Sequence, residues 1–370
     1  MKKIILVALI VVVCVVLVLV NKGNGETIKI GVQLFLTGPA SALGETQKRA
    51  VYMAQEKINA EGGIDGKQVE IIISDSGYDP KIALNSYNEL KLKGVKYIVT
   101  DGSPVVAAIR ETIIKDGNLI ITGIPTTPAY FDGSNMSCRI GLTAKNFGPA
   151  YSDLLSKNDY SNVAMLLPEN EYGRGLYDEF KKVFKGEIVI AEFYDALNTG
   201  GDYRTHLTKI KAKQSNIDAL ILVQVTNTIE SLLKQKKELG VNLPIVTDYY
   251  TANNPSLKNR DLLNGAKYVD YDYLSMIQDS DSETTKSFKT KYFEKYGSEA
   301  PLFVTATYDP IVILLDAIKA VGDNPKKVGK YISELENYSA VTGTLTFNDD
   351  CEVDRTPVFR KIVNGKIESL

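Results

Sequence analysis

From residue 27 onward, short runs of β-branched and apolar residues alternate with amphipathic stretches that carry apolar residues at helical spacing. TIKIGVQLF (27–35) is predicted to be the first strand. The stretch 44–60 is predicted to be a helix, which the glycines of EGGIDGK end. Alternation of this kind is typical of parallel α/β construction. The apolar side chains of the helix form one face: Ala50, Val51, Ala54 and Ile58.

The strand and helix series runs twice along the chain and restarts at NVAMLLP (162–168). Each series predicts one doubly wound lobe, which is a parallel sheet covered by helices on both faces. No low-complexity linker separates the lobes, so we expect several chain crossings to join them. The predicted division is a signal or anchor over 1–25, lobe 1 over 26–143, lobe 2 over 144–270, a return to lobe 1 over 271–335, and a crossover with C-terminal strands over 336–370.

The amino terminus carries the longest apolar run, because Lys2 and Lys3 precede seventeen apolar residues at 4–20. As a helix this run is about 25 Å long, close to the thickness of one hydrocarbon core. Positive charge before an apolar core is typical of a secretory signal, so the remainder is predicted to be extracytoplasmic, in the periplasm or at the cell surface. The following NKGNGE is a weak cleavage site. Two alternatives therefore stay open, a removed signal and an uncleaved transmembrane anchor.

Charge and residue types narrow the function. The 43 basic and 45 acidic residues give a net charge of -2, which argues against nucleic acid as a partner. One histidine (His206), scattered cysteines and the lack of a glycine-rich phosphate loop argue against a catalytic triad, a metal site and a cofactor. A binding protein is therefore favoured over an enzyme. Cys138 and Cys351 both lie in the exported part, where disulfides persist, but no spacing argument shows that they pair.

Polar residues gather in the loops that follow the predicted strands, where open α/β sheets bind ligands. Ser103 follows the strand KYIVT and precedes a helix that begins near residue 104, while Thr126 and Thr127 stand between two prolines after NLIIT. These hydroxyls and the amides of the helix start predict a site for a carboxylate or another polar acceptor. In the second series, Tyr172 enters a helix and 248–250 (DYY) follow a strand. An acid opposite hydroxyls and amides suits a zwitterion.

These segments resemble the type I periplasmic solute-binding proteins of branched-chain amino acid importers, the leucine/isoleucine/valine-binding group. The resemblance runs from about residue 27 to the end. It implies two Rossmann-like lobes joined by three crossovers, with the ligand in the cleft and hinge closure on binding. The segments that carry it are IKIGVQLFLTGPASALGE, INAEGGIDGKQVEIIISDSGYDP, DGSP, GIPTTP, ENEYGRG, ATYDPIVILLDAI, TGTLTFNDD and RTPVFRKIVNGK.

The resemblance also implies which residues bind the main-chain groups of the ligand. Ser103 and Thr126, with the backbone near Ile124 and Pro125, correspond to the group that holds the α-carboxylate. Tyr172 corresponds to the tyrosine of the second lobe that closes over the ligand.

The remaining positions concern the ammonium and the side chain of the ligand. Asp248 or Tyr249 falls where the family has an acid, and Asp248 is favoured because a cation in a closed cleft requires a paired charge. Phe303 matches a position that lines the side-chain pocket. Leu43 and Val225 stand where the family has aromatic or polar residues, so the identity of the ligand stays open.

The predicted function is an extracytoplasmic substrate-binding protein of an ABC importer, which binds a small polar ligand, preferably an amino acid. Its expected partners are the permease subunits, and its expected membrane contact is the N-terminal apolar segment. A receptor for an amide or urea-type ligand, and a ligand sensor without a transporter, are the alternatives.

Overall fold

The computed structural model describes residues 27–124, 134–271 and 282–370. The first half of the chain builds a parallel five-stranded sheet with the strand order β2-β1-β3-β4-β5. β1, β3 and β4 are buried almost throughout, because helices cover both faces of the sheet. The strands are β1 (Ile28–Leu34), β2 (Val69–Asp75), β3 (Tyr97–Thr100), β4 (Leu119–Thr122) and β5 (Ser137–Arg139).

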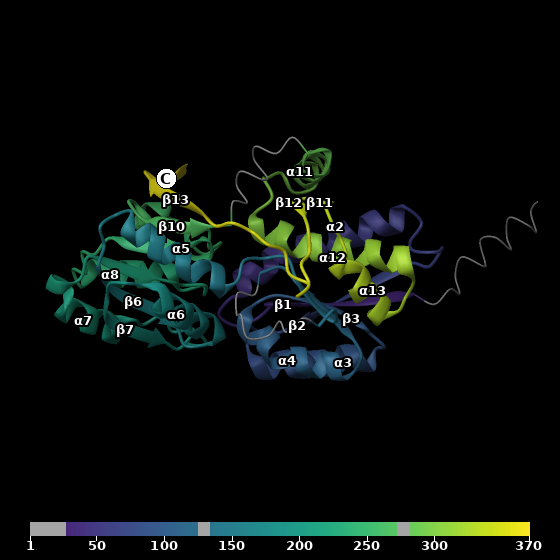
Figure 1. Cartoon of the computed structure of the whole chain (residues 1–370), viewed down its shortest axis with the longest axis horizontal. Coiled ribbons are helices and arrows are strands. Elements are labelled where there is room, and N and C mark those ends of the chain that lie inside the picture. Colours follow the sequence, from purple (N-terminus) through teal and green to yellow (C-terminus); the bar gives the residue numbers. More distant parts are fainter. Residues whose placement is uncertain (1–26, 125–133, 272–281) are drawn as a thin grey trace, which may run out of the picture.

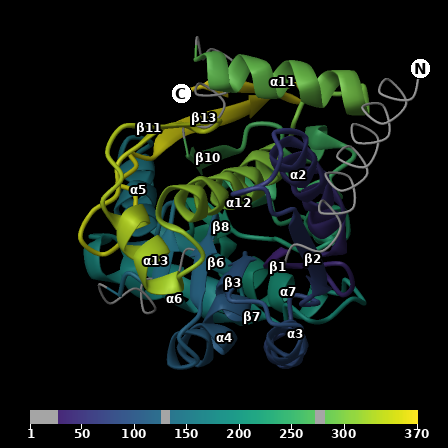
Figure 2. The same cartoon turned by 90° about the vertical axis from the view of Figure 1, so that its right-hand side faces the viewer.

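Two layers of helices enclose the first sheet, as Figure 1 and Figure 2 show. α3 (Pro80–Leu92) and α4 (Ser103–Lys115) pack against each other on one face. α2 (Ser41–Ala60), α12 (Leu302–Val321) and α13 (Pro325–Ser333) cover the other face, and α12 packs along α2. Residues from both ends of the sequence therefore complete the same layer.

The second sheet has seven strands in the order β14-β13-β10-β9-β8-β6-β7. The five strands from β10 to β7 are parallel, and β13 and β14 add an antiparallel edge. α5 packs on α6, and α7 packs on α8. The strands are β6 (Asn162–Pro168), β7 (Glu187–Tyr194), β8 (Ala219–Leu222), β9 (Ile245–Asp248), β10 (Lys267–Asp270), β13 (Val358–Val363) and β14 (Lys366–Ser369). The helices are α5 (Ala144–Ser156), α6 (Glu171–Val183), α7 (Arg204–Ala212), η2 (Gln214–Asn216), α8 (Ile229–Glu238), α9 (Tyr249–Ala252) and η3 (Arg260–Leu263).

The chain passes between the two sheets three times. It crosses after β5 to α5, after β10 to α11 (Glu283–Tyr296), and after β12 (Gly343–Leu345) to β13. Among the described strands, β12 pairs with β11 (Tyr338–Ala340) alone, and β11 contacts α11. The predicted fold of two doubly wound lobes with three crossovers is therefore confirmed.

A disulfide joins Cys138 to Cys351, so the pairing that the sequence left open is present. Cys138 lies in β5, and Cys351 lies in the segment that makes the third crossing. Their Cα atoms are 4.8 Å apart. The Arg139 amide donates to the Cys351 carbonyl at 2.9 Å, and the Val353 amide donates to the Arg139 carbonyl at 3.1 Å. The third crossing is thus fixed to the edge of the first sheet.

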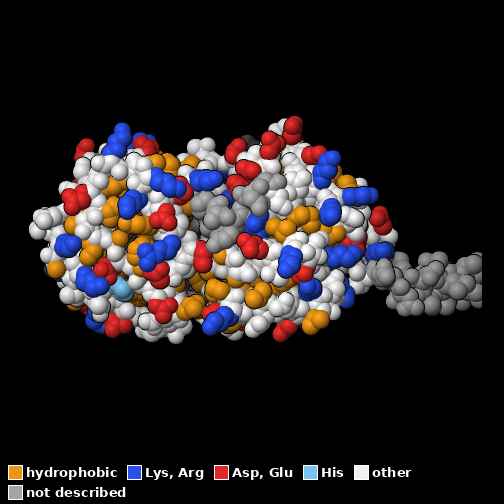
Figure 3. Space-filling view, turned by 60° about the horizontal axis from the view of Figure 1, so that its bottom comes forward, with side chains coloured by type: hydrophobic (Ala, Val, Ile, Leu, Met, Phe, Trp, Pro, Cys, Tyr) orange, Lys and Arg blue, Asp and Glu red, His pale blue; other side chains and the backbone are white. Residues whose placement is uncertain are grey.

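The predicted signal or anchor at 1–25 lies outside the described residues. Within the described ranges, no helix has the length and apolar character needed to cross a membrane. On the face drawn in Figure 3, basic and acidic side chains are interspersed over both halves of the molecule, in keeping with the small net charge.

Candidate functional site

A cavity lies where the two halves of the molecule meet, and the space between its walls, with the part open to solvent included, is about 400 Å³. Its walls come from segments that follow strands of both sheets and from the first turn of α12. The half of the molecule built on the five-stranded sheet is called the first half, and the half built on the seven-stranded sheet is called the second half. The first half supplies Phe35, Leu43, Gln47, Tyr78, Asp101, Gly102, Ser103, Ile124 and Phe303. The second half supplies Tyr172, Val225 and Tyr250.

The strand order explains why these residues meet. β1 lies between β2 and β3, and β6 lies between β7 and β8, so the chain leaves each central strand in one direction and later returns on its other side. The place where the strand order reverses in this way is called a topological switch point. The loops on its two sides diverge and leave a crevice beyond the carboxyl ends of the strands. Phe35 follows β1, Asp101 follows β3, and Tyr172 follows β6. Of the loop positions that the sequence singled out, Ser103, Ile124 and Tyr172 line this crevice.

Ser103 lies at the first turn of α4 and is 3% exposed. The residue before it, Gly102, has φ 83°, a conformation that favours glycine. A Cβ atom at Gly102 would lie 2.8 Å from Cζ of Phe35. Glycine therefore lets the Phe35 ring approach the start of α4 and form the cavity wall beside Ser103.

Asp101 is a buried carboxylate in the cavity wall that the sequence analysis did not select. Its Oδ1 accepts the amides of Gly123 at 3.0 Å and Ile124 at 2.9 Å. Its Oδ2 accepts Gln47 Nε2 at 2.6 Å and lies 3.3 Å from the Thr307 hydroxyl, whose nearer acceptor is the Phe303 carbonyl at 2.9 Å. Burial raises the pKa of Asp101 to about 6, although these hydrogen bonds favour the ionised form. Ionisation of Asp101 therefore lowers the free energy of unfolding of the protein without ligand.

We expect Asp101→Asn to stabilise the empty protein at pH 8 by up to about 3 kcal/mol. The pKa of Asp101 in the folded protein is about 6, above the ordinary aspartate value of 3.8, so the folded protein binds the proton more tightly than the unfolded chain does. The stability that this group contributes is therefore lost as the pH rises from about 4 to about 6. The difference in unfolding free energy between variant and wild type should shrink as pH falls from about 6 to about 4. Urea unfolding at pH 8 and pH 4.5 measures it, and a difference independent of pH would contradict the assignment.

Asp248 lies behind Tyr172 and is not itself a wall residue of the cavity. The Tyr172 hydroxyl donates to Asp248 Oδ2, and the Thr251 amide donates to Oδ1 at 2.8 Å, so Asp248 also caps α9. Burial raises the pKa of Asp248, while these hydrogen bonds oppose the shift. A tyrosine hydroxyl that donates to a carboxylate keeps its lone pairs as acceptors. Asp248 therefore contacts the wall residue Tyr172 and does not itself line the cavity.

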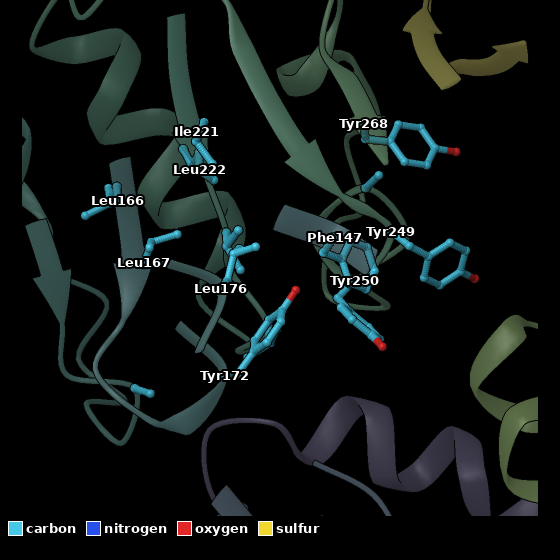
Figure 4. Packing of buried hydrophobic residues seen from close by; sticks show 14 of the residues in the cluster. Phe147, Leu166, Leu167, Tyr172, Leu176, Ile221, Leu222, Tyr249, Tyr250 and Tyr268 are labelled. Carbon is cyan, nitrogen blue, oxygen red and sulfur yellow. The ribbon is translucent and has the colours of Figure 1, made fainter. Parts of the chain in front are cut away.

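Of the two neighbouring tyrosines, Tyr250 faces the cavity and Tyr249 does not. Tyr250 lines the cavity, and its hydroxyl donates to the Ile124 carbonyl at 3.0 Å, which joins the two halves. The Tyr249 ring packs on Phe303 at 5.9 Å and does not line the cavity. Figure 4 shows Tyr250 between Tyr172 and Tyr249, and the ring centroids of Tyr172 and Tyr250 are 5.7 Å apart.

The structure brings most of the residues selected from the sequence to one cavity. Asp248 and Tyr249 lie behind its wall, while Pro125 and Thr126 lie outside the described residues. Sequence reasoning missed several wall residues, although Asp101 stands in the DGSP loop and Phe35 ends the first predicted strand. The selected residues in the wall are Leu43, Ser103, Ile124, Tyr172, Val225 and Phe303. The missed ones are Phe35, Gln47, Tyr78, Asp101 and Gly102, while Tyr250 belongs to the loop 248–250 that the sequence analysis named without assigning this tyrosine a role.

Asn227, two residues after the wall residue Val225, makes three hydrogen bonds to the first half of the molecule. Its amide nitrogen donates to the Pro39 carbonyl at 2.6 Å, and its Nδ2 donates to the Ser41 hydroxyl at 2.9 Å. Its Oδ1 accepts the Ala42 amide at 3.3 Å. The N-cap of α2, Ala40, has no side chain that could cap the helix. Asn227 of the opposite half supplies this cap.

The single histidine is away from the cavity. His206 forms a hydrogen bond with Glu192 at 2.8 Å, and Lys209 also binds Glu192. Within the described ranges, no group of three or more His, Cys, Asp or Glu side chains is placed to hold a metal ion.

Three comparisons with known proteins agree with this geometry. A family model described as periplasmic binding protein matches residues 27–361. The leucine-, isoleucine-, valine-, threonine-, and alanine-binding protein of Pseudomonas aeruginosa is 25% identical over 335 residues, 88% of this chain and 86% of that protein. The Leu/Ile/Val-binding protein of Escherichia coli K12 is 24% identical over 344 residues, 91% of this chain and 90% of that protein. The branched-chain amino acid transporter substrate binding protein LivJ from Streptococcus pneumoniae, solved with isoleucine, has a TM-score of 0.80 at 24% identity and covers 93% and 98% of the two chains.

Proposed function

We propose that this chain, which belongs to the periplasmic binding protein family, is the extracytoplasmic substrate-binding protein of an ABC importer. Its ligand is a small amino acid, and its partners are the permease subunits. The observation that carries this proposal is the cavity, which loops at the carboxyl ends of two sheets enclose. Relatives that match most of the chain are named for binding amino acids.

The proposed position of the ligand follows from the polar groups of each half. Ser103, at the start of α4, and Thr126 hold the α-carboxylate, since a helix start and hydroxyls favour an anion. The ammonium lies against Tyr172, whose hydroxyl oxygen accepts while its proton is donated to Asp248. The charge of Asp248 thereby compensates the ammonium from behind the wall.

A thermal-shift screen of amino acids and their amides, on the fragment that begins at Glu26, tests this function. A ligand at 100 times its dissociation constant stabilises the fold by about 2.7 kcal/mol. We expect at least one free amino acid to raise the melting temperature and its carboxamide to do so much less. Equal shifts for acid and amide would replace this proposal with the amide-binding alternative.

We also propose that the two halves move as lobes, with 26–143 and 271–335 as lobe 1, 144–270 as lobe 2, and 336–370 as the last crossover. Asn227 then stabilises the closed arrangement, because its contacts join the lobes. Asn227→Ala is expected to weaken amino acid binding by about 3- to 10-fold, the cost of one lost cap. Calorimetry measures the affinity, and Asn259→Ala, which removes a cap within the second half alone, is the control. Equal affinities of wild type and Asn227→Ala would contradict this role.

For the N-terminal segment we propose an uncleaved anchor. Residues 4–20 are apolar and the following cleavage site is weak. The full chain is expected in the membrane fraction, with the part from residue 27 accessible to protease from outside. A mature form that begins after Gly25 in the soluble fraction would show that the segment is a removed signal.

A further inference from the structure

We propose that the ligand carries a second, cationic nitrogen in addition to its α-amino acid group, and that Asp101 and Gln47 bind this nitrogen. The inference rests on the proposed function, because it concerns which amino acid the cavity selects. It concerns the side chain of the ligand, whereas Ser103 and Tyr172 are proposed to bind its main-chain groups.

The first observation is an uncompensated charge. Asp101 is the only charged side chain among the described residues that line the cavity, and it is 3% exposed. Its hydrogen-bond donors are the amides of Gly123 and Ile124 and the side chain of Gln47, all of them neutral. The single proton of the Thr307 hydroxyl is nearer to the Phe303 carbonyl, at 2.9 Å, than to Asp101 Oδ2, at 3.3 Å, so Oδ2 keeps one acceptor site. A buried carboxylate without a counter-charge is unfavourable. A cation inside the cavity would supply the missing charge.

The second observation is an unused acceptor beside that carboxylate. Gln47 is 1% exposed, and its Nε2 donates to Asp101 Oδ2 and, at 3.0 Å, to the Thr307 hydroxyl. These bonds fix the orientation of the amide, because rotating it would place an oxygen 2.6 Å from the carboxylate. The Oε1 atom of Gln47 then has no partner among the described residues. A nitrogen that donates to both Asp101 and Gln47 would satisfy it.

The third observation is the aromatic wall. Phe35, Tyr78, Tyr172, Tyr250 and Phe303 line the same cavity. The faces of aromatic rings attract cations, and the attraction is strongest where water is excluded. A neutral donor would gain only the hydrogen bonds, so the rings and the carboxylate together favour a cation.

A purely structural role for Asp101 does not explain why this buried residue is charged. Asp309 is a buried aspartate with that role, since it accepts the amides of Val341 at 2.9 Å and Thr342 at 2.8 Å. The charge of Arg355 acts on Asp309 and favours its ionised form. Among the described residues, no basic side chain is a main cause of the pKa shift of Asp101. An asparagine would bind Gly123 and Ile124 equally well without the cost of burying a charge.

Ornithine, glutamine and norleucine test the inference, because their side chains have the same number of chain atoms and differ in the terminal group. Calorimetry at pH 8 should find ornithine bound more tightly than glutamine, and norleucine bound weakest. Asp101→Asn should weaken ornithine binding by about 10- to 150-fold and change norleucine binding by less than about 3-fold. Gln47→Met should weaken ornithine and glutamine by about 3- to 10-fold and leave norleucine unchanged.

Two matched variants serve as controls. Asp309→Asn is the control for Asp101→Asn, because Asp309 is a buried aspartate away from the cavity. Gln33→Met is the control for Gln47→Met, because Gln33 is a buried glutamine that bonds Ala83 and Ser86. Both should leave the order of the three ligands unchanged. If Asp101→Asn does not fold, the inference is still tested by the order in which the wild type binds the three ligands and by the affinities of Gln47→Met.

The outcomes separate the two proposals. Norleucine or leucine binding as tightly as ornithine would overturn the inference and leave the amino acid receptor intact. Ornithine binding that Asp101→Asn does not weaken would also overturn it. If no amino acid binds the wild-type protein, the proposed function fails and the inference fails with it.

Discussion

Asp248→Asn is expected to weaken amino acid binding by about 2 to 5 kcal/mol, or roughly 30- to 4,000-fold. Asp248 now accepts the Tyr172 hydroxyl proton, which leaves the oxygen of that hydroxyl as an acceptor at the cavity wall. The amide NH2 of an asparagine would donate to Tyr172 instead. The Tyr172 proton would then point toward the ligand, and the ammonium would lose both its acceptor and the buried charge that compensates it.

Calorimetry with the best amino acid from the screen measures this effect. Ser103→Ala is expected to cost less, about 1 to 3 kcal/mol, because it removes one neutral hydroxyl. Asparagine at 248 can still cap α9 by accepting the Thr251 amide. The melting temperature of the empty variant should therefore stay near that of wild type, and a fall in affinity would not reflect unfolding. Unchanged affinity of Asp248→Asn would place the ammonium elsewhere and favour an amide ligand.

Loss of the Cys138–Cys351 disulfide is expected to lower the unfolding free energy by about 2 to 5 kcal/mol and the melting temperature by roughly 5–15 °C. The bond joins positions 213 residues apart, so it removes much of the freedom of the unfolded chain. It also fixes the third crossing to β5, at the edge of the first sheet. The double variant Cys138→Ala, Cys351→Ala shows the effect in thermal unfolding.

Reductant provides the control for the disulfide. It should lower the melting temperature of the wild type toward that of the double variant and leave the double variant unchanged. The full chain contains three cysteines, so the unfolded, unreduced protein should expose one thiol, that of Cys14, and the reduced protein three. Three thiols without reductant, in protein recovered from outside the cytoplasm, would contradict the disulfide.

The sequence by itself determined the fold class and the region of the site. Continuous apolar runs such as YIVT and LIIT predicted strands buried on both faces, and the structure confirms them as β3 and β4. Because parallel strands bring their carboxyl ends to one edge, polar loops after separate strands were expected to meet. Ser103, Tyr172 and Val225 do meet at one cavity, although they are far apart in the sequence.

Only the tertiary structure decided which side chain of each loop faces the cavity. Asp248 and Tyr250 are two residues apart, yet Tyr250 lies in the wall and Asp248 lies behind Tyr172. A loop has no fixed periodicity, so its pattern of residue types does not determine the direction of each side chain. The pairing of Cys138 with Cys351, the approach of Asn227 to α2 and the isolation of the Asp101 charge likewise depend on contacts between distant segments. Such contacts arise from the packing of whole elements, which local sequence does not encode.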